Sequence, residues 1–200
     1  RAGRCLAMAD FLVLGSTGAG KSLLVRRLKG LCNQQHRLTN VVDTMPTVGV
    51  ELDEMTHNRV NFSVREVGGS FLPVWPRYYD DSRVLLYMID VSDHSKLVCL
   101  LHQARFTTLQ SLSFVPLLDA ISSRDMKDKP IFLIFNKTDL PMTMDRMDVS
   151  SVLRLDELRE SLGPRFRIFY LSAFSEAGLG ELLEAMVQLL SPGQPKKKSR

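Results

Sequence analysis

The feature that most constrains this chain is a glycine-rich stretch that fits the pattern G-x-x-x-x-G-K-[ST] of a phosphate-binding loop. It consists of Gly15, Ser16, Thr17, Gly18, Ala19, Gly20, Lys21 and Ser22. A short apolar segment precedes it, and apolar residues recur at helical spacing after it, so a chance match in a glycine turn is disfavoured. Such a strand, loop and helix direct backbone N–H groups and a helix dipole to one point. We predict that the loop binds phosphates, with Lys21 neutralising the outer phosphates and the Ser22 hydroxyl binding Mg²⁺.

Length and composition exclude several classes of protein. A chain of 200 residues suits one α/β domain with a full core. It contains no run of 18 apolar residues and no apolar signal region, so we expect neither a transmembrane helix nor a secretory signal. Cys5, Cys32 and Cys99 form no C-x-x-C pair, which indicates reduced cytosolic thiols. The four His residues form no i, i+4 pair, which argues against a zinc site.

The positive charge of the chain lies at its C-terminal end. The net charge is +4, and Lys196, Lys197, Lys198 and Arg200 account for the whole excess. The rest is neutral, which argues against a nucleic-acid-binding domain. We predict an N-terminal extension over residues 1–8, one domain over 9–190 and a basic disordered tail over 191–200. The tail is either simply solvated or makes weak contact with anionic lipid, worth ~1 kcal/mol per charge.

Apolar runs alternate with amphipathic segments along the chain. Besides the segment before the glycine-rich loop, one expected strand begins at 48–52 and turns at Asn58-Arg59 into the next, 60–64. The other expected strands are 84–89, 131–135 and 166–171. The expected helices are 97–121 (interrupted), 152–162 and a final one that ends near Leu190. Residues 84–89 and 131–135 are continuously apolar, as in parallel strands buried on both faces. The pattern predicts a doubly wound α/β fold with ligands at the carboxyl ends of the strands.

Two polar segments follow strands and could read a base. In Asn136-Lys137-Thr138-Asp139, the Asp139 carboxylate can accept from both N1–H and the 2-amino group of guanine, whereas adenine offers no such pair of donors. Asn136 and the stem of Lys137 would hold the loop and cover the ring. In Ser172-Ala173-Phe174, the Ala173 N–H could donate to guanine O6. A polar β–α turn is the alternative, but the phosphate-binding loop upstream favours guanine binding.

Two further segments could respond to the γ-phosphate. The Thr47 hydroxyl, in Pro46-Thr47-Val48-Gly49, could complete the Mg²⁺ shell, although the same sequence also suits a turn before a strand. Glu66 could hold a Mg²⁺-bound water, and the Gly69 N–H could meet the γ-phosphate. We expect both segments to be ordered by a triphosphate and released by a diphosphate.

With these motifs, and with Trp75-Pro-Arg-Tyr78, the chain resembles a small GTPase of the Ras superfamily over about residues 9–190. It is most similar to the ADP-ribosylation factor (Arf) and Arf-like family, and Arg65–Ser70 resembles a divergent branch of it. The resemblance implies the P-loop NTPase (small G-protein) fold, with a six-stranded mostly parallel sheet and helices on both faces. It also implies GTP or GDP with Mg²⁺ as cofactors. From the resemblance we expect a monomer that is cytoplasmic, or peripheral at a membrane or the cilium. We also expect it to signal to effectors and to have an exchange factor and an activating protein.

Several residues depart from the family pattern. Arg65 and Glu66 stand where the family usually has Trp-Asp, and Val50 replaces another aromatic, whereas Tyr78 remains. We therefore expect an altered effector surface. Roughly a dozen extra residues are expected around 106–129. No Met-Gly start and no C-terminal Cys are visible, so lipid anchoring is not expected.

The largest departure is Ser70, which stands where related GTPases have the Gln that orients the attacking water. The segment from Gly69 to Trp75 is also about two residues short. We predict complete nucleotide binding with very slow hydrolysis, and the catalytic residue stays unknown. Three hypotheses remain open: a GTP-regulated switch, a GTP-loaded scaffold that rarely cycles, and another P-loop enzyme such as a nucleotide kinase. The Asn136–Asp139 segment speaks against the kinase.

Overall fold

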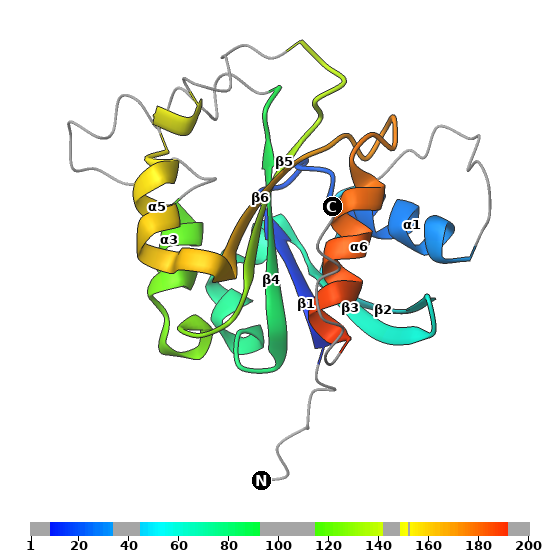
Figure 1. Ribbon diagram of the computed structural model, residues 1–200, viewed down its shortest axis with the longest axis horizontal. Coiled ribbons are helices and arrows are strands. Elements are labelled where there is room, and N and C mark those ends of the chain that lie inside the picture. The colour runs from blue at the N-terminus through cyan, green and yellow to red at the C-terminus, as the bar shows by residue number, and fades with distance from the viewer. Residues whose placement is uncertain (1–8, 34–44, 93–114, 142–148, 152, 192–200) are drawn as a thin grey trace, which may run out of the picture.

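Six strands form one sheet, in the order β2-β3-β1-β4-β5-β6 (Figure 1). The strands are β1 (Ala9–Gly15), β2 (Val50–His57), β3 (Val60–Val67), β4 (Ser82–Asp90), β5 (Ile131–Asn136) and β6 (Phe166–Tyr170). Strands β2 and β3 are antiparallel, and all other neighbours are parallel. This computed structural model describes residues 9–33, 45–92, 115–141, 149–151 and 153–191. The predicted mostly parallel α/β sheet is confirmed.

Helices cover both faces of the sheet. They are α1 (Lys21–Cys32), α3 (Val115–Ser122), α5 (Leu155–Leu162) and α6 (Leu179–Leu190), with short 3₁₀ helices η1 (Gly69–Tyr78), η2 (Arg124–Met126) and η3 (Gly163–Arg165). Figure 1 shows α1 and α6 on one side of the sheet and α3 and α5 on the other. In the described part of the chain, no helix is long and apolar enough to cross a membrane.

Two separate apolar cores result from this arrangement. Because side chains alternate along a strand, Phe11 and Val13 of β1 enter the core under α1 and α6, whereas Leu12 and Leu14 enter the core under α3 and α5. All four side chains are fully buried. The sheet is therefore packed on both faces and leaves the carboxyl ends of its central strands as the place for a ligand.

The strand predictions were correct in position, although the ends of several strands differ. The apolar runs at 84–89 and 131–135 are the cores of β4 and β5. The turn at Asn58 and Arg59 joins β2 to β3, and both residues have positive φ angles, 48° and 66°, as a tight hairpin requires. Strand β2, expected to begin at 48–52 and to continue to the turn at Asn58-Arg59, spans Val50–His57. Its edge position leaves most of it exposed, so the sequence lacks an apolar signal there.

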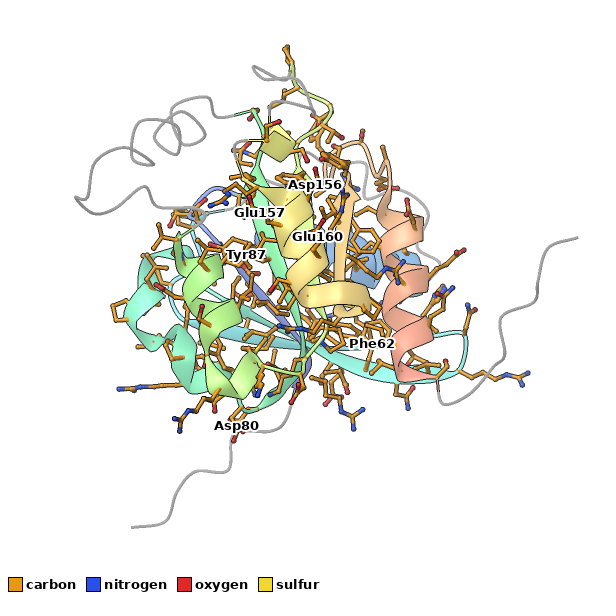
Figure 2. All side chains as sticks on the ribbon, turned by 60° about the vertical axis from the view of Figure 1, so that its left-hand side comes forward. Phe62, Asp80, Tyr87, Asp156, Glu157 and Glu160 are labelled. Carbon is orange, nitrogen blue, oxygen red and sulfur yellow. The ribbon has the colours of Figure 1, made fainter. Side chains whose placement is uncertain are left out.

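The predicted positions of α1, α5 and α6 were likewise correct. Helix α5 begins at Leu155 rather than at residue 152, because Arg154 has a left-handed conformation with φ of 49°. Figure 2 shows its Asp156, Glu157 and Glu160 side chains on the outer face, while Leu155 and Leu162 are buried. Of the helix expected over 97–121, only α3 falls within the described residues. The N-terminal extension 1–8, part of the insertion 106–129, and the tail with Lys196, Lys197, Lys198 and Arg200 lie outside them.

Candidate functional site

Most of the predicted site residues line a single cavity of about 390 Å³ at the carboxyl ends of the strands. They are Thr17, Gly18, Gly20, Lys21, Ser22, Thr47, Glu66, Gly69, Asn136, Lys137, Asp139 and Phe174. The remaining ones do not line the cavity but belong to the loops that form it: Gly15, Ser16, Ala19, Ser172 and Ala173. Met45 and Leu140 also line the cavity. These two could not be predicted from the sequence, because exposed apolar residues in loops belong to no motif.

The phosphate-binding loop wraps around the Lys21 ammonium group. Its Nζ donates to the carbonyl oxygens of Gly15 at 2.9 Å and Ser16 at 3.0 Å. Burial lowers the pKa of Lys21 to about 8, and the nearby Glu66 carboxylate opposes that shift. Phosphate groups beside this ammonium would favour its charged form. The loop therefore presents a fixed, buried cation to the cavity.

Asn136 ties the base-binding loops to the phosphate-binding loop. Its Nδ2 donates to the Ala19 carbonyl at 2.8 Å, and its Oδ1 accepts from the Ala173 N–H at 2.9 Å. A Cβ at Gly20 would lie 2.4 Å from the same Nδ2, so only glycine fits there. The Ala173 N–H thus already donates within the protein, which was not expected. Donation from it to guanine O6 stays a prediction and would require sharing this N–H.

A second network fixes the Asp139 carboxylate. The Ser172 hydroxyl donates to Asp139 Oδ1 at 2.5 Å and accepts from the backbone N–H groups of Phe174 and Ser175. Ser172 is fully buried, whereas Phe174 is 62% exposed. Asp139 is therefore held as an acceptor at the wall of the cavity, where a pair of base N–H groups could reach it.

The sequence missed an ion pair behind the same loop. Lys137 Nζ lies 2.6 Å from Asp90 Oδ2, and Asp90 is almost fully buried at the end of β4. Asp90 Oδ1 also accepts from the Ser92 N–H and hydroxyl. The ion pair holds the Lys137 stem across the loop, as covering a base ring would require. The partner could not be read from the sequence, since the two residues meet only through the pairing of β4 with β5.

Three oxygen-bearing side chains meet at the phosphate end of the cavity. The Ser22 hydroxyl donates to Glu66 Oε1 at 2.7 Å, and the Thr47 hydroxyl donates to the same oxygen at 3.1 Å. Burial raises the pKa of the Glu66 carboxyl, while Ser22, Lys21 and Thr47 lower it and Glu51 raises it. Hydroxyl and carboxylate oxygens suit Mg²⁺, which binds through few protein ligands when phosphates supply the others. Among the described residues, no group of three or more His, Cys, Asp or Glu side chains offers an alternative metal site.

Comparisons with known proteins identify the family of the chain. The model of the ADP-ribosylation factor family matches residues 6–190. The chain belongs to the Arf family. It is 32% identical to human ADP-ribosylation factor-like protein 16 over 86% of this chain and 81% of that protein. It is 27% identical to ADP-ribosylation factor 1 of Brassica rapa subsp. pekinensis, over 92% and 90% of the two chains.

The fold is shared with a solved structure of the same family. The Arl6 BBS3 small GTPase of Trypanosoma brucei, solved with the nucleotide analogue GppNp, matches with a TM-score of 0.67 at 20% identity. The match covers 91% of this chain and 99% of that one. This chain is thus an Arf-like small GTPase, a nucleotide-binding switch, in a family that binds GTP and GDP and interacts with effectors, exchange factors and activating proteins.

The segment after β3, which begins η1 at Gly69, packs against the phosphate-binding loop. A Cβ at Gly69 would lie 2.3 Å from the Thr17 N atom, so this position tolerates only glycine. Ser70 follows it and is exposed. Trp75 is buried and its indole N–H donates to the Gly68 carbonyl at 3.2 Å. The start of η1 is therefore held by the packing of Gly69 on the phosphate-binding loop and by the bond from Trp75.

Arg65 contributes less to the surface than the family pattern implied. It is only 3% exposed, and its guanidinium lies over the Tyr78 ring at 5.3 Å from the centroid. The exposed apolar residues beside it are Val48, Val50 and Leu52, which are 87%, 41% and 45% exposed. Arg65 is therefore buried, and the exposed side chains on β2 and just before it include an aliphatic strip of Val48, Val50 and Leu52.

Proposed function

We propose that this chain binds GTP and GDP together with Mg²⁺ and recruits effector proteins in its triphosphate form. The observation that carries the proposal is the shared cavity. The buried Lys21, the Ser22 and Thr47 hydroxyls, and Asp139, fixed by Ser172, face the same 390 Å³ space. Phosphates, a divalent cation and a guanine base are the ligand groups that suit those three parts. Lys21 and the backbone of residues 15–22 would bind the phosphates.

In this proposal Mg²⁺ supplies charge neutralisation for the phosphates when bound. Ser22 and Thr47 would hold it from two different segments of the chain. Thr47 lies on the segment before β2, and Gly69 lies at the start of η1. A γ-phosphate would draw both segments to the phosphate-binding loop, and its loss would release them. Effectors would then bind the exposed strip of Val48, Val50 and Leu52, which follows Thr47 in the chain.

A second function is favoured by one residue, Ser70. Without the water-positioning glutamine, hydrolysis is expected to be very slow, and the protein would act as a GTP-loaded scaffold that rarely cycles. Single-turnover hydrolysis, measured alone and with candidate activating proteins, separates the two. A role in membrane or ciliary traffic, at a membrane surface, is proposed from the family alone.

The proposed function is tested by the fluorescence of Trp75, the single tryptophan of the chain. Its indole N–H is bonded to Gly68, next to the Gly69 N–H that would meet a γ-phosphate. Exchange of GDP for GppNp in the presence of Mg²⁺ is expected to change the emission. The adenine analogue AppNp should leave it unchanged. Equal effects of both analogues, or no effect of GppNp, would refute the proposed switch.

A further inference from the structure

Three oxygen atoms form a close triangle at the end of the cavity. The Ser22 Oγ lies 2.8 Å from Thr47 Oγ1 and 2.7 Å from Glu66 Oε1, and Thr47 Oγ1 lies 3.1 Å from the same Glu66 oxygen. The three residues come from α1, from the segment before β2, and from β3. They line the cavity together with Lys21. Segments far apart in the chain therefore place three oxygens within contact of each other.

The triangle holds fewer protons than it has contacts. Two hydroxyl groups supply two protons, and an ionised carboxylate supplies none. At least one of the three contacts then brings together two oxygen lone pairs without a proton between them. A cation that all three oxygens face would remove this repulsion, because each oxygen could direct a lone pair to it. A protonated Glu66 carboxyl would also supply the missing proton, and the experiment below separates the two.

The size of the triangle matches a face of a magnesium octahedron. Magnesium binds oxygen at about 2.0–2.1 Å in near-ideal octahedral geometry, which places adjacent ligand oxygens about 2.9 Å apart. The observed separations of 2.7, 2.8 and 3.1 Å lie on both sides of this value. Calcium, with bonds of about 2.3–2.6 Å, would require larger separations.

The length of the Glu66 side chain explains why the carboxylate reaches this position. A shorter aspartate at the same backbone position would end about one C–C bond earlier, which leaves room for a water between carboxylate and ion. Glu66 is 2% exposed and lies at the end of β3, where the Gly68 N–H donates to the Gly49 carbonyl and holds the two segments together. The carboxylate is thus buried and directed at the two hydroxyls.

We propose that the Glu66 carboxylate binds the Mg²⁺ of the nucleotide directly, so that Ser22, Thr47 and Glu66 occupy one face of its octahedron. This rests on the proposed function, since the nucleotide supplies the phosphate ligands. In the triphosphate form, two phosphate oxygens would join the three protein oxygens and leave one place for water. A carboxylate acting only through a water would leave two such places.

The test counts the waters on Mn²⁺ that replaces Mg²⁺ in the GppNp-loaded chain. Electron paramagnetic resonance lines of Mn²⁺ broaden in water enriched in the magnetic oxygen isotope, in proportion to the bound waters. We expect one bound water in the unmodified chain and an additional one in Glu66→Asp. The matched control is Glu51→Asp, the same change directly opposite on β2, which should leave the count unchanged.

Nucleotide content is measured by chromatography on the same samples. Two bound waters in the unmodified chain would overturn the inference while leaving the proposed function intact. This outcome can be measured on the unmodified chain alone. The same count in Glu66→Asp as in the unmodified chain would also overturn it. A chain that retains no GppNp would refute the proposed function itself.

Discussion

At the residue scale, recognition of the guanine base depends most on Asp139. Its carboxylate accepts from Ser172 through one oxygen and lies in the cavity wall, where it can accept from two guanine N–H groups. Asp139→Ala removes the acceptor, so we expect the preference for guanine over adenine nucleotides to disappear. Asp139→Asn offers a donor and an acceptor instead, which suits the 2-oxo group and N1–H of xanthine. Competition of GDP, ADP and xanthosine diphosphate against a fluorescent nucleotide measures both. A retained guanine preference in Asp139→Ala would contradict this role.

Asn136 is the residue on which the geometry of the site depends. Asn136→Ala would leave the Ala19 carbonyl and the Ala173 N–H without their buried partner. Each unpaired group should lower the free energy of unfolding by about 1–3 kcal/mol. For a chain of this size, the melting temperature should fall by roughly 2–4 °C for each kcal/mol lost. Thermal unfolding with saturating GDP measures the change. Asn61→Ala is the control, because the Asn61 side chain accepts an exposed hydrogen bond from the Thr56 hydroxyl. This variant should have the melting temperature of the unmodified chain. Equal melting of both variants would refute the role of Asn136.

At the element scale, the start of η1 packs closely against the phosphate-binding loop at Gly69. Gly69→Ala places a Cβ 2.3 Å from the Thr17 N atom and 2.6 Å from the Ser16 carbonyl carbon, so η1 has to shift away. We expect weaker binding of GppNp than in the unmodified chain and a smaller loss for GDP, because only the triphosphate would contact Gly69. Equilibrium titration with both nucleotides measures this difference.

Gly180→Ala is the matched control for that change. Gly180 lies in α6, and a Cβ there meets nothing within 4 Å. Alanine favours a helix over glycine by about 0.5–1 kcal/mol, so the melting temperature should stay or rise slightly. Nucleotide affinities should not change. Loss of GppNp binding in both variants would show that the effect is not specific to η1.

Some helices and strands could be predicted from the sequence, and others could not. Strands β4 and β5 could be predicted because they are continuously apolar and buried on both faces. The start of β2 could not be predicted as well, because β2 lies at the edge of the sheet and its polar residues carry no pattern. The phosphate-binding motif predicted its own loop. The partners of Asn136 and Lys137 could not be predicted, since Ala173 and Asp90 reach them only through the pairing of neighbouring strands.

At the scale of the whole molecule, nucleotide binding and hydrolysis are separable. Most of the predicted phosphate-binding and base-binding residues line the cavity. Ser70 does not line it, and we predict that its side chain is too short to hold the attacking water. Intrinsic GTP hydrolysis is expected at or below about 10⁻⁴–10⁻³ s⁻¹, the range of a relative that has the glutamine. Single-turnover hydrolysis with preloaded GTP measures the rate. A rate above about 0.01 s⁻¹ would overturn this prediction.

Ser70→Gln separates two reasons for slow hydrolysis. If the missing side chain alone limits the rate, the variant should hydrolyse GTP faster. If the short segment that Trp75 anchors to Gly68 holds the glutamine out of place, the rate should stay low. Nucleotide affinity should be the same in both proteins, because Ser70 does not line the cavity. A changed affinity would contradict the assignment of Ser70 to hydrolysis alone.

The central claim is that this cavity binds guanine nucleotides, and an equilibrium competition on the unmodified chain tests it most directly. GDP, GTP, ADP and ATP compete, with Mg²⁺ present, for the site held by a fluorescent guanine nucleotide. A site built to hydrogen-bond one partner rejects an analogue that lacks those groups by about 10⁴–10⁵. We therefore predict that GDP and GTP displace the probe at concentrations at least about 10³ below those of ADP and ATP. Equal displacement by adenine and guanine nucleotides would contradict the account.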